Sequence, residues 1–303
     1  MSLSLECIVA RKLTILAVQA KPHAIGTDFS LFEDEVRERL AGHQDVDMLV
    51  FPELHLFHAE ASGLAETNAM LRASAVPLDG ALDRALAALA ARLGVCLVPG
   101  SLVEAGPRGE LFNTARVYGA DGAVLATYRK VFPWRPSEPY DPGCDWVVFD
   151  LPGKGRIGLT ICYDAWFPEA TRQVAWMGAE VVLNVVKTTT PDRAQELVLA
   201  RANAIVNQLY MLSLNCAGPV GEGQSLLVDP EGKVIAECVG ASPASLYHTL
   251  DLDQVTRVRR DGTCGENRLW AQFRPDDAPI PLPAYGGRID PATWWPGTGV
   301  KNP

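Results

Sequence analysis

The chain has 303 residues, of which 48% are hydrophobic and 21% are charged, so it can bury a large core in one α/β domain or two smaller ones. Its 27 Lys and Arg residues and 36 Asp and Glu residues give a formal net charge of −9. This acidic balance argues against a general nucleic-acid or membrane-surface role, because both need a basic face. We therefore expect neither nucleic acid nor membrane as a partner.

Cysteine usage and apolar runs indicate the compartment. The seven cysteines are scattered, and no two of them have C-x-x-C spacing. This is typical of a reduced chain without a disulfide framework or structural zinc. No apolar run reaches membrane-spanning length, and residues 1–12 lack the features of a signal peptide. We expect a cytoplasmic protein, with residues 1–12 as an N-terminal extension.

Strand and helix signals alternate through the first half of the chain. Asp28 can cap a helix that ends near Leu40, and Gly94 can close a second helix that begins near Leu82. A hairpin is expected around Ala120-Asp121-Gly122. Buried-strand patterns cover residues 13–19, 47–52 and 95–99.

The second half continues the alternation. Helices are expected from Pro168 to about Met177 and from Pro191, as the first helical residue, to about Asn207. Strands are expected at residues 146–151, 157–161, 180–186, 209–215, 225–228, 234–237 and 247–252. The alternation predicts mixed sheets covered by helices within one domain, residues 13–261.

Residues 262–303 form a tail rich in proline and aromatic residues. Disordered segments are usually poor in aromatic residues, so we expect this tail to pack on the domain or on a partner subunit. Its aromatic residues are Trp270, Phe273, Tyr285, Trp294 and Trp295.

Cys162 follows the apolar run of residues 157–161 and precedes a helix start at Pro168 and Glu169. A nucleophile on such a turn is held rigidly, and the neighbouring backbone N–H groups can face a substrate oxygen. A buried core cysteine is the alternative interpretation, because reactivity needs partners that act on the thiol. Asp164, two residues on, is expected to be a helix N-cap or an ion-pair partner.

Two further strand ends supply such partners. Glu53 ends the run of residues 47–52, and Lys130 follows the predicted hairpin. A carboxylate can take the thiol proton, and an ammonium can stabilise the thiolate and the oxyanion of a tetrahedral intermediate. Glu53, Lys130 and Cys162 therefore suit acyl transfer from a C–N bond, with no need for a histidine base.

These segments resemble the three catalytic blocks of the nitrilase superfamily, the carbon–nitrogen hydrolases. The matching motifs are Phe51-Pro-Glu53, Tyr128-Arg-Lys130, and Cys162-Tyr-Asp164 with Phe167-Pro-Glu169. The likeness covers roughly residues 13–252. It implies an α-β-β-α sandwich of two mixed sheets and a homodimer that extends it to eight layers, or a higher homo-oligomer. It also implies a Cys162–Glu53–Lys130 triad whose oxyanion is held by Lys130 and the Tyr163 N–H.

The loop after Lys130 resembles that of aliphatic amidases and formamidases. In those enzymes a second glutamate lies eight residues after the lysine, which corresponds to Glu138 here. The resemblance implies that Glu138 orients the amide substrate and bonds the lysine. The alternative is an exposed loop glutamate between Pro136 and Pro139.

The chain departs from some relatives near the nucleophile. Many of them have arginine at the position of Trp166, and its absence argues against a substrate with a free carboxylate, such as an N-carbamoyl amino acid. An apolar acyl pocket walled by Trp134, Tyr140 and Trp166 is expected, although Trp166 could be a packing residue only. Lys187 lines this pocket or belongs to a solvated loop.

The predicted function is an amidase that hydrolyses a small uncharged carboxamide through a cysteine thioester. Alternatives are an acyl or amide transferase with an amine acceptor, an N-carbamoyl amide hydrolase, and a non-catalytic binding scaffold. His55, His58 and Glu60 are too loosely spaced for a convincing metal site. We expect no metal and no cofactor.

Overall fold

The computed structural model describes residues 10–281 and 286–289. The predictions for residues 1–9 and for Tyr285, Trp294 and Trp295 of the tail lie outside the described residues. The chain forms two compact units, Met1–Leu269 and Trp270–Pro303. In the second unit, the backbone N–H of Arg274 donates to the carboxylate of Asp277 across a short turn.

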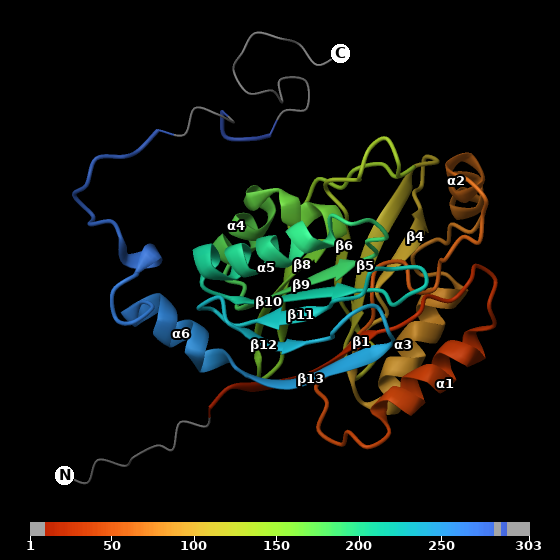
Figure 1. The fold of residues 1–303 in the computed structure, drawn as a ribbon, viewed down its shortest axis with the longest axis horizontal. Helices are drawn as coiled ribbons and strands as arrows, with labels where there is room; N and C mark the ends of the chain where they lie inside the picture. The colour runs from red at the N-terminus through yellow and green to blue at the C-terminus, as the bar shows by residue number, and fades with distance from the viewer. Residues whose placement is uncertain (1–9, 282–285, 290–303) are drawn as a thin grey trace. The chain divides into compact units, whose positions relative to one another are not determined.

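A seven-stranded sheet in the first unit has the order β13-β1-β2-β3-β5-β4, with β6 paired to β5 (Figure 1). β1, β2 and β3 are parallel, whereas β13 and β4 to β6 pair antiparallel. The strands are β1 Lys12–Gln19, β2 Met48–Val50, β3 Cys96–Val98, β4 Ser101–Ala105, β5 Leu111–Tyr118, β6 Val124–Arg129 and β13 Ala244–Asp251.

The second sheet has six strands in the order β12-β11-β10-β9-β8-β7. β8, β9 and β10 are parallel, so their carboxyl ends lie at one edge of the sheet. The strands are β7 Val148–Leu151, β8 Gly155–Ile161, β9 Val181–Val186, β10 Tyr210–Asn215, β11 Leu226–Val228 and β12 Val234–Glu237.

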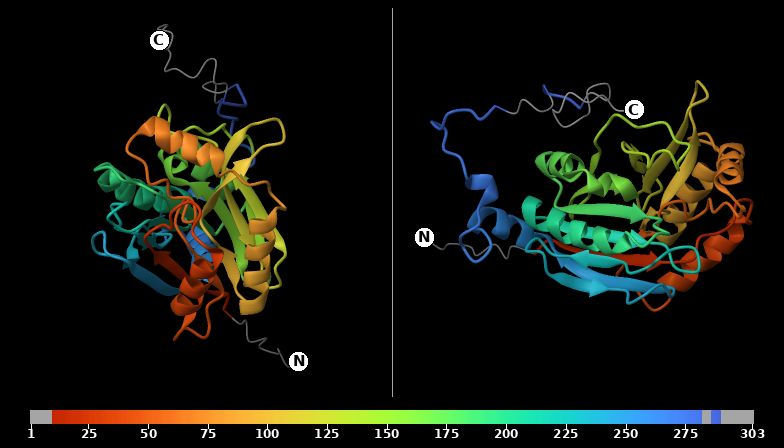
Figure 2. Two further views of the ribbon diagram at one scale, coloured as in Figure 1. Left: turned by 90° about the vertical axis from the view of Figure 1, so that its right-hand side faces the viewer. Right: turned by 45° about the horizontal axis from the view of Figure 1, so that its top comes forward.

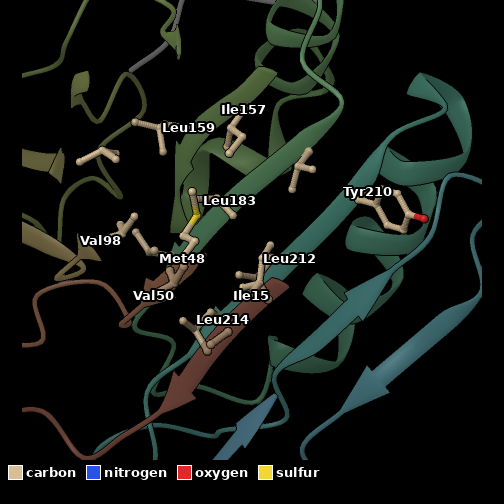
Figure 3. Packing of buried hydrophobic residues seen from close by; sticks show 14 of the residues in the cluster. Ile15, Met48, Val50, Val98, Ile157, Leu159, Leu183, Tyr210, Leu212 and Leu214 are labelled. Atoms are coloured by element: carbon tan, nitrogen blue, oxygen red, sulfur yellow. The ribbon is translucent and has the colours of Figure 1, made fainter. Parts of the chain in front are cut away.

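The inner faces of the two sheets share one hydrophobic core, part of which Figure 3 shows at close range. Every second residue of a strand points into this core, as expected from strand geometry. From the first sheet come Ile15, Met48 and Val98, and from the second come Ile157, Leu159, Leu183, Leu212 and Leu214.

Helices cover both outer faces (Figures 1 and 2). On the first sheet, Phe32 and Val36 of α1 and Leu86 and Leu89 of α3 belong to a second apolar cluster that includes Leu49. α4 and α5 contact β8 and β10 of the other sheet. The helices are α1 Phe29–Leu40, α2 Leu64–Ala73, α3 Ala81–Leu93, α4 Pro168–Trp176, α5 Arg193–Asn207 and α6 Leu252–Asp261, with short 3-10 helices η1 Cys162–Trp166 and η2 Leu269–Ala271. The predicted α-β-β-α sandwich is confirmed, and the dimer stays a prediction.

Three elements were not predicted from the sequence: β4, α2 and α6. α6 contains the basic residues Arg257, Arg259 and Arg260, and its apolar side is narrow, with three buried residues. Arg259 of this helix donates to the backbone carbonyls of Gln208 and Ala179, which gives it a structural role. The position of Pro191 was also wrong, because the cap of α5 is Asp192 and Pro191 precedes it.

Candidate active site

Cys162 lies at the edge of the second sheet, directly after β8. It is the first residue of η1 and has a φ of 47°, which is strained for a residue with a side chain. The buried Asp164 carboxylate holds this turn, since it accepts hydrogen bonds from the backbone N–H groups of Ile161 and Phe132 and from the Tyr128 hydroxyl. Asp164 therefore ties the nucleophile turn to the segment that follows β6.

Glu53 is fixed just beyond β2 in the first sheet, with 1% of its surface exposed. Its Oε1 accepts hydrogen bonds from Lys130 Nζ at 3.1 Å and from Asn113 Nδ2 at 2.7 Å. Gly100 passes so close behind this segment that a Cβ there would lie 1.8 Å from the Pro52 carbonyl oxygen. The close backbone approach requires glycine, and it helps to fix the position of Glu53.

Lys130 joins two carboxylates. Its Nζ lies 2.8 and 2.9 Å from the two oxygens of Glu138, in addition to its bond to Glu53. The backbone N–H of Trp134 donates to Glu138 at 2.7 Å and fixes the loop around the pair. Burial alone would lower the pKa of Lys130, but the charges of Glu53 and Glu138 raise it well above its ordinary value. Lys130 is thus a permanent cation at neutral pH.

The pKa of the Cys162 thiol depends on burial and on the charges of Glu53 and Lys130. Burial and the nearby Glu53 carboxylate raise the pKa of Cys162 well above its ordinary value, while Lys130 opposes the rise. The resting sulfur is therefore a protonated thiol, which would need a base to act as a nucleophile. Thr188 Oγ1 lies 3.9 Å from the sulfur and donates at 2.8 Å to the buried Glu196.

The predicted pocket residues have different environments. Trp134 is 40% exposed, and Trp166 is partly buried, with its ring centroid 6.0 Å from that of Tyr163. Tyr140 is buried, and its hydroxyl has no hydrogen-bond partner among the described residues. Burial and the carboxylate of Glu138 raise the pKa of Tyr140, so it is a neutral donor.

Sequence reasoning missed several polar residues that support this site. Asn113 is buried in β5 and donates to Glu53. Arg193 is 1% exposed and pairs with Glu196 at 2.9 Å, and Glu196 in turn holds Thr188 beside the sulfur. The only signal for them in the sequence was a polar residue within an otherwise apolar strand or at a helix start.

The structure groups His55 with His23 and Glu35, and not with His58 and Glu60 as considered in the sequence analysis. His23 and His55 both donate from Nε2 to Glu35, at 2.8 and 3.0 Å, and these three ligand atoms lie within 4.8 Å of one another. The distances are those of hydrogen bonds, and Arg39 adds a positive charge 3.5 Å from Glu35. The absence of a metal and of a cofactor stays a prediction.

Comparison with solved structures identifies the class of fold to which the chain belongs. Among solved structures, Saccharomyces cerevisiae Nit3, a member of the nitrilase superfamily, superimposes with a TM-score of 0.73 at 25% identity, over 82% of this chain and 94% of the other. A cysteine-to-alanine mutant of the amidase from Nesterenkonia sp. AN1, in complex with butyramide, gives a TM-score of 0.66 at 26% identity, over 83% of this chain and 95% of the other. The fold is therefore that of the nitrilase superfamily.

The sequence comparisons narrow this class. A family model described as carbon-nitrogen hydrolase matches residues 12–260, and the chain belongs to this family. Formamidases from Pseudomonas syringae pv. syringae and from Bradyrhizobium sp. are 31% and 30% identical over 71% and 74% of this chain. The chain spans 62% and 66% of the lengths of these relatives.

None of the helices among the described residues combines the length and the apolar composition needed to cross a bilayer.

Proposed function

We propose that the protein is an amidase that hydrolyses a small carboxamide, preferentially a primary one, to a carboxylic acid and ammonia. The observation that carries the proposal is the buried Lys130 bridging Glu53 and Glu138 within electrostatic reach of Cys162. A base, a fixed cation and a protonated thiol are the groups that acyl transfer through a cysteine requires.

In the first step, Glu53 takes the proton of the Cys162 thiol while the sulfur bonds to the amide carbon. The electron pair of the carbonyl π bond moves to oxygen, and Lys130 and the Tyr163 N–H stabilise the resulting oxyanion. This order suits a thiol of raised pKa, because the proton leaves only as the sulfur attacks.

Collapse of the tetrahedral intermediate breaks the C–N bond. Glu53 returns the proton to the leaving nitrogen, ammonia departs, and a thioester remains on Cys162. Water then attacks the thioester carbon as Glu53 takes its proton. The C–S bond breaks, the carboxylic acid leaves, and Glu53 returns the proton to the sulfur.

Glu138 and Tyr140 orient the amide in this proposal. The carboxylate of Glu138 holds Lys130 and can accept an N–H of a primary amide, and the Tyr140 hydroxyl is a buried donor without a partner among the described residues. Two facts about relatives support an amide substrate. A cysteine-to-alanine mutant of the Nesterenkonia amidase forms a complex with butyramide, and in another mutant the acetamide moiety of fluoroacetamide is added covalently to the active-site cysteine.

The test is ammonia release from formamide, propionamide, a phenylalkyl amide, an N-carbamoyl amino acid and a nitrile. Cys162→Ala is the inactive variant, and Cys144→Ala, which removes an exposed free cysteine, is the matched control. Release from amides that is lost only in Cys162→Ala supports the proposal. No release from any amide, or release that survives in Cys162→Ala, would refute it.

A further inference from the structure

Thr188 lies just beyond β9, and its hydroxyl contacts the sulfur of Cys162. Its Oγ1 is 3.9 Å from Sγ, a distance suited to a hydrogen bond that involves sulfur. Among the described residues the sulfur makes no other hydrogen bond, and none joins it to Glu53. In the resting site the thiol is therefore bonded to Thr188 and not to the proposed base.

The backbone of Thr188 is fixed by the buried side chain of Asn215, which ends β10. Oδ1 of Asn215 accepts a hydrogen bond from the Thr188 N–H at 2.9 Å, and its Nδ2 donates to the Thr188 carbonyl at 3.2 Å. The same amide group also accepts from the N–H of Cys216 and donates to the carbonyl of Gly223. Thr188 cannot move along the edge of the sheet without breaking these bonds, so its distance from the sulfur is fixed.

The hydroxyl of Thr188 has one proton, and Glu196 accepts it. Oγ1 lies 2.8 Å from each oxygen of the Glu196 carboxylate, which pairs with Arg193 at 2.9 Å. A carboxylate in an ion pair can only accept, so the hydroxyl is the donor. The Thr188 oxygen then has only lone pairs left for Cys162, and the sulfur must be the donor in the contact between them.

A hydrogen bond in which the sulfur donates exists only while Cys162 is protonated. Such a bond to the neutral form of an acid opposes its ionisation. Of the charged groups that act on the sulfur, three carboxylates oppose a thiolate and one ammonium favours it. These groups are Glu53, Glu196, Glu138 and Lys130 respectively. Geometry and charge therefore both hold the resting residue as a thiol.

We propose that Thr188 is a positioning residue that binds the thiol proton of Cys162 until an amide occupies the site. The S–H group must turn from Thr188 toward Glu53 before the proton is transferred, and no covalent bond changes in this turn. The inference rests on the proposed function for the identity of the nucleophile. It predicts that, without substrate, the sulfur reacts slowly with other electrophiles.

The S–H stretching band of Cys162 tests the hydrogen bond directly, because the band moves to lower frequency when the group donates. The infrared spectrum of the unaltered protein minus that of Cys162→Ala isolates this band from those of the other cysteines, and each variant is treated in the same way. We expect Thr188→Val, which keeps the shape of the side chain, to shift the band to higher frequency. Thr188→Ser, which keeps the acceptor oxygen, should leave it in place.

Thr14→Val is the matched control. It removes a buried hydroxyl near the amino end of β1 that bonds to Thr249 at 3.0 Å. The loss of a buried threonine hydroxyl as such should not move the band.

Iodoacetamide labelling at neutral pH, read on the peptide that contains Cys162, measures the effect on reactivity. Thr188→Val should label about 3- to 10-fold faster than the unaltered protein, the factor expected for one lost hydrogen bond to the neutral thiol. Thr188→Ser and Thr14→Val should label at the unaltered rate. A band that does not move in Thr188→Val, or labelling that is no faster, overturns the role of Thr188. Neither measurement uses a substrate, so the result is independent of the test of the amidase function.

Discussion

Asn113 Nδ2, near the start of β5 in the first sheet, donates a hydrogen bond of 2.7 Å to Oε1 of Glu53. The same oxygen accepts from Lys130, so the carboxylate that we propose as the base is held by one neutral and one charged donor. Proton transfer depends on such fixed geometry.

Asn113→Ala should therefore lower kcat about 10- to 100-fold, the effect expected for one hydrogen bond to a charged group. Steady-state kinetics measure this effect. A lower melting temperature with an unchanged kcat would instead indicate a purely structural role.

A substitution of Glu138 tests whether this residue takes part in the reaction or is only a loop glutamate. Glu138→Gln keeps the shape of the side chain but removes the second charge on Lys130, and we expect kcat/KM to fall about 100- to 1,000-fold. Glu237→Gln, an exposed glutamate of β12, is the control. If the two variants have equal activity, Glu138 has no function in the reaction.

Arg193 is a buried cation that is linked to Cys162 through Glu196 and Thr188. It is 1% exposed and donates to Glu196, to Ser213 and to the carbonyl of Gly223. Arg193→Met leaves the Glu196 carboxylate buried without its cation, and should lower the free energy of unfolding by about 3–5 kcal/mol.

Urea denaturation measures this loss. Arg37→Met breaks two pairs on the exposed surface of α1 and should cost less than about 1 kcal/mol. A similar small cost for Arg193→Met would show that Glu196 does not depend on the arginine.

His55 and Glu35 make stability depend on pH. Burial lowers the pKa of His55 below its ordinary 6.5, although the Glu35 carboxylate opposes this shift. Burial would raise the pKa of Glu35, but the hydrogen bonds from His23 and His55 hold it well below 4.5. Both groups bind fewer protons in the folded state than in the unfolded state. Stability should therefore be complete above pH 6.5 and fall as the pH drops, first through His55 and then, below 4.5, through Glu35 as well.

Denaturation series between pH 7.5 and pH 5 test this prediction. The slope due to His55 should approach about 1.4 kcal/mol per pH unit, and it should be smaller in His55→Phe, whose ring can pack against Phe32 and Phe51. Equal slopes in the two proteins would contradict the assignment to His55.

Strand ends made the fold and the positions of the proposed catalytic residues predictable. The short run of β2 stops at Pro52 with Glu53 next, and β8 stops at Cys162, so the order of apolar runs located both residues at sheet edges. α2 could not be predicted, because Leu71 is its only buried residue and no apolar stripe marks it.

Hydrogen bonds between polar residues far apart in the sequence could not be predicted from the sequence alone. Asn113 is 60 residues from Glu53, and their contact depends on how β5 and the end of β2 pack. The environment of Lys187 is a similar case, because two of the charges that act on it, those of Glu53 and Glu138, come from segments far away in the sequence. The sequence analysis left it open whether Lys187 lines the pocket.

The central claim is that Cys162 carries the acyl group during the reaction. The most direct test is intact-protein and peptide mass spectrometry of the unaltered protein, mixed with excess propionamide and quenched with acid during turnover. We predict one propionyl group on the peptide that contains Cys162, removable by hydroxylamine and absent from Cys162→Ala. A propionyl group on another residue, or turnover of propionamide that persists in Cys162→Ala, would contradict the account.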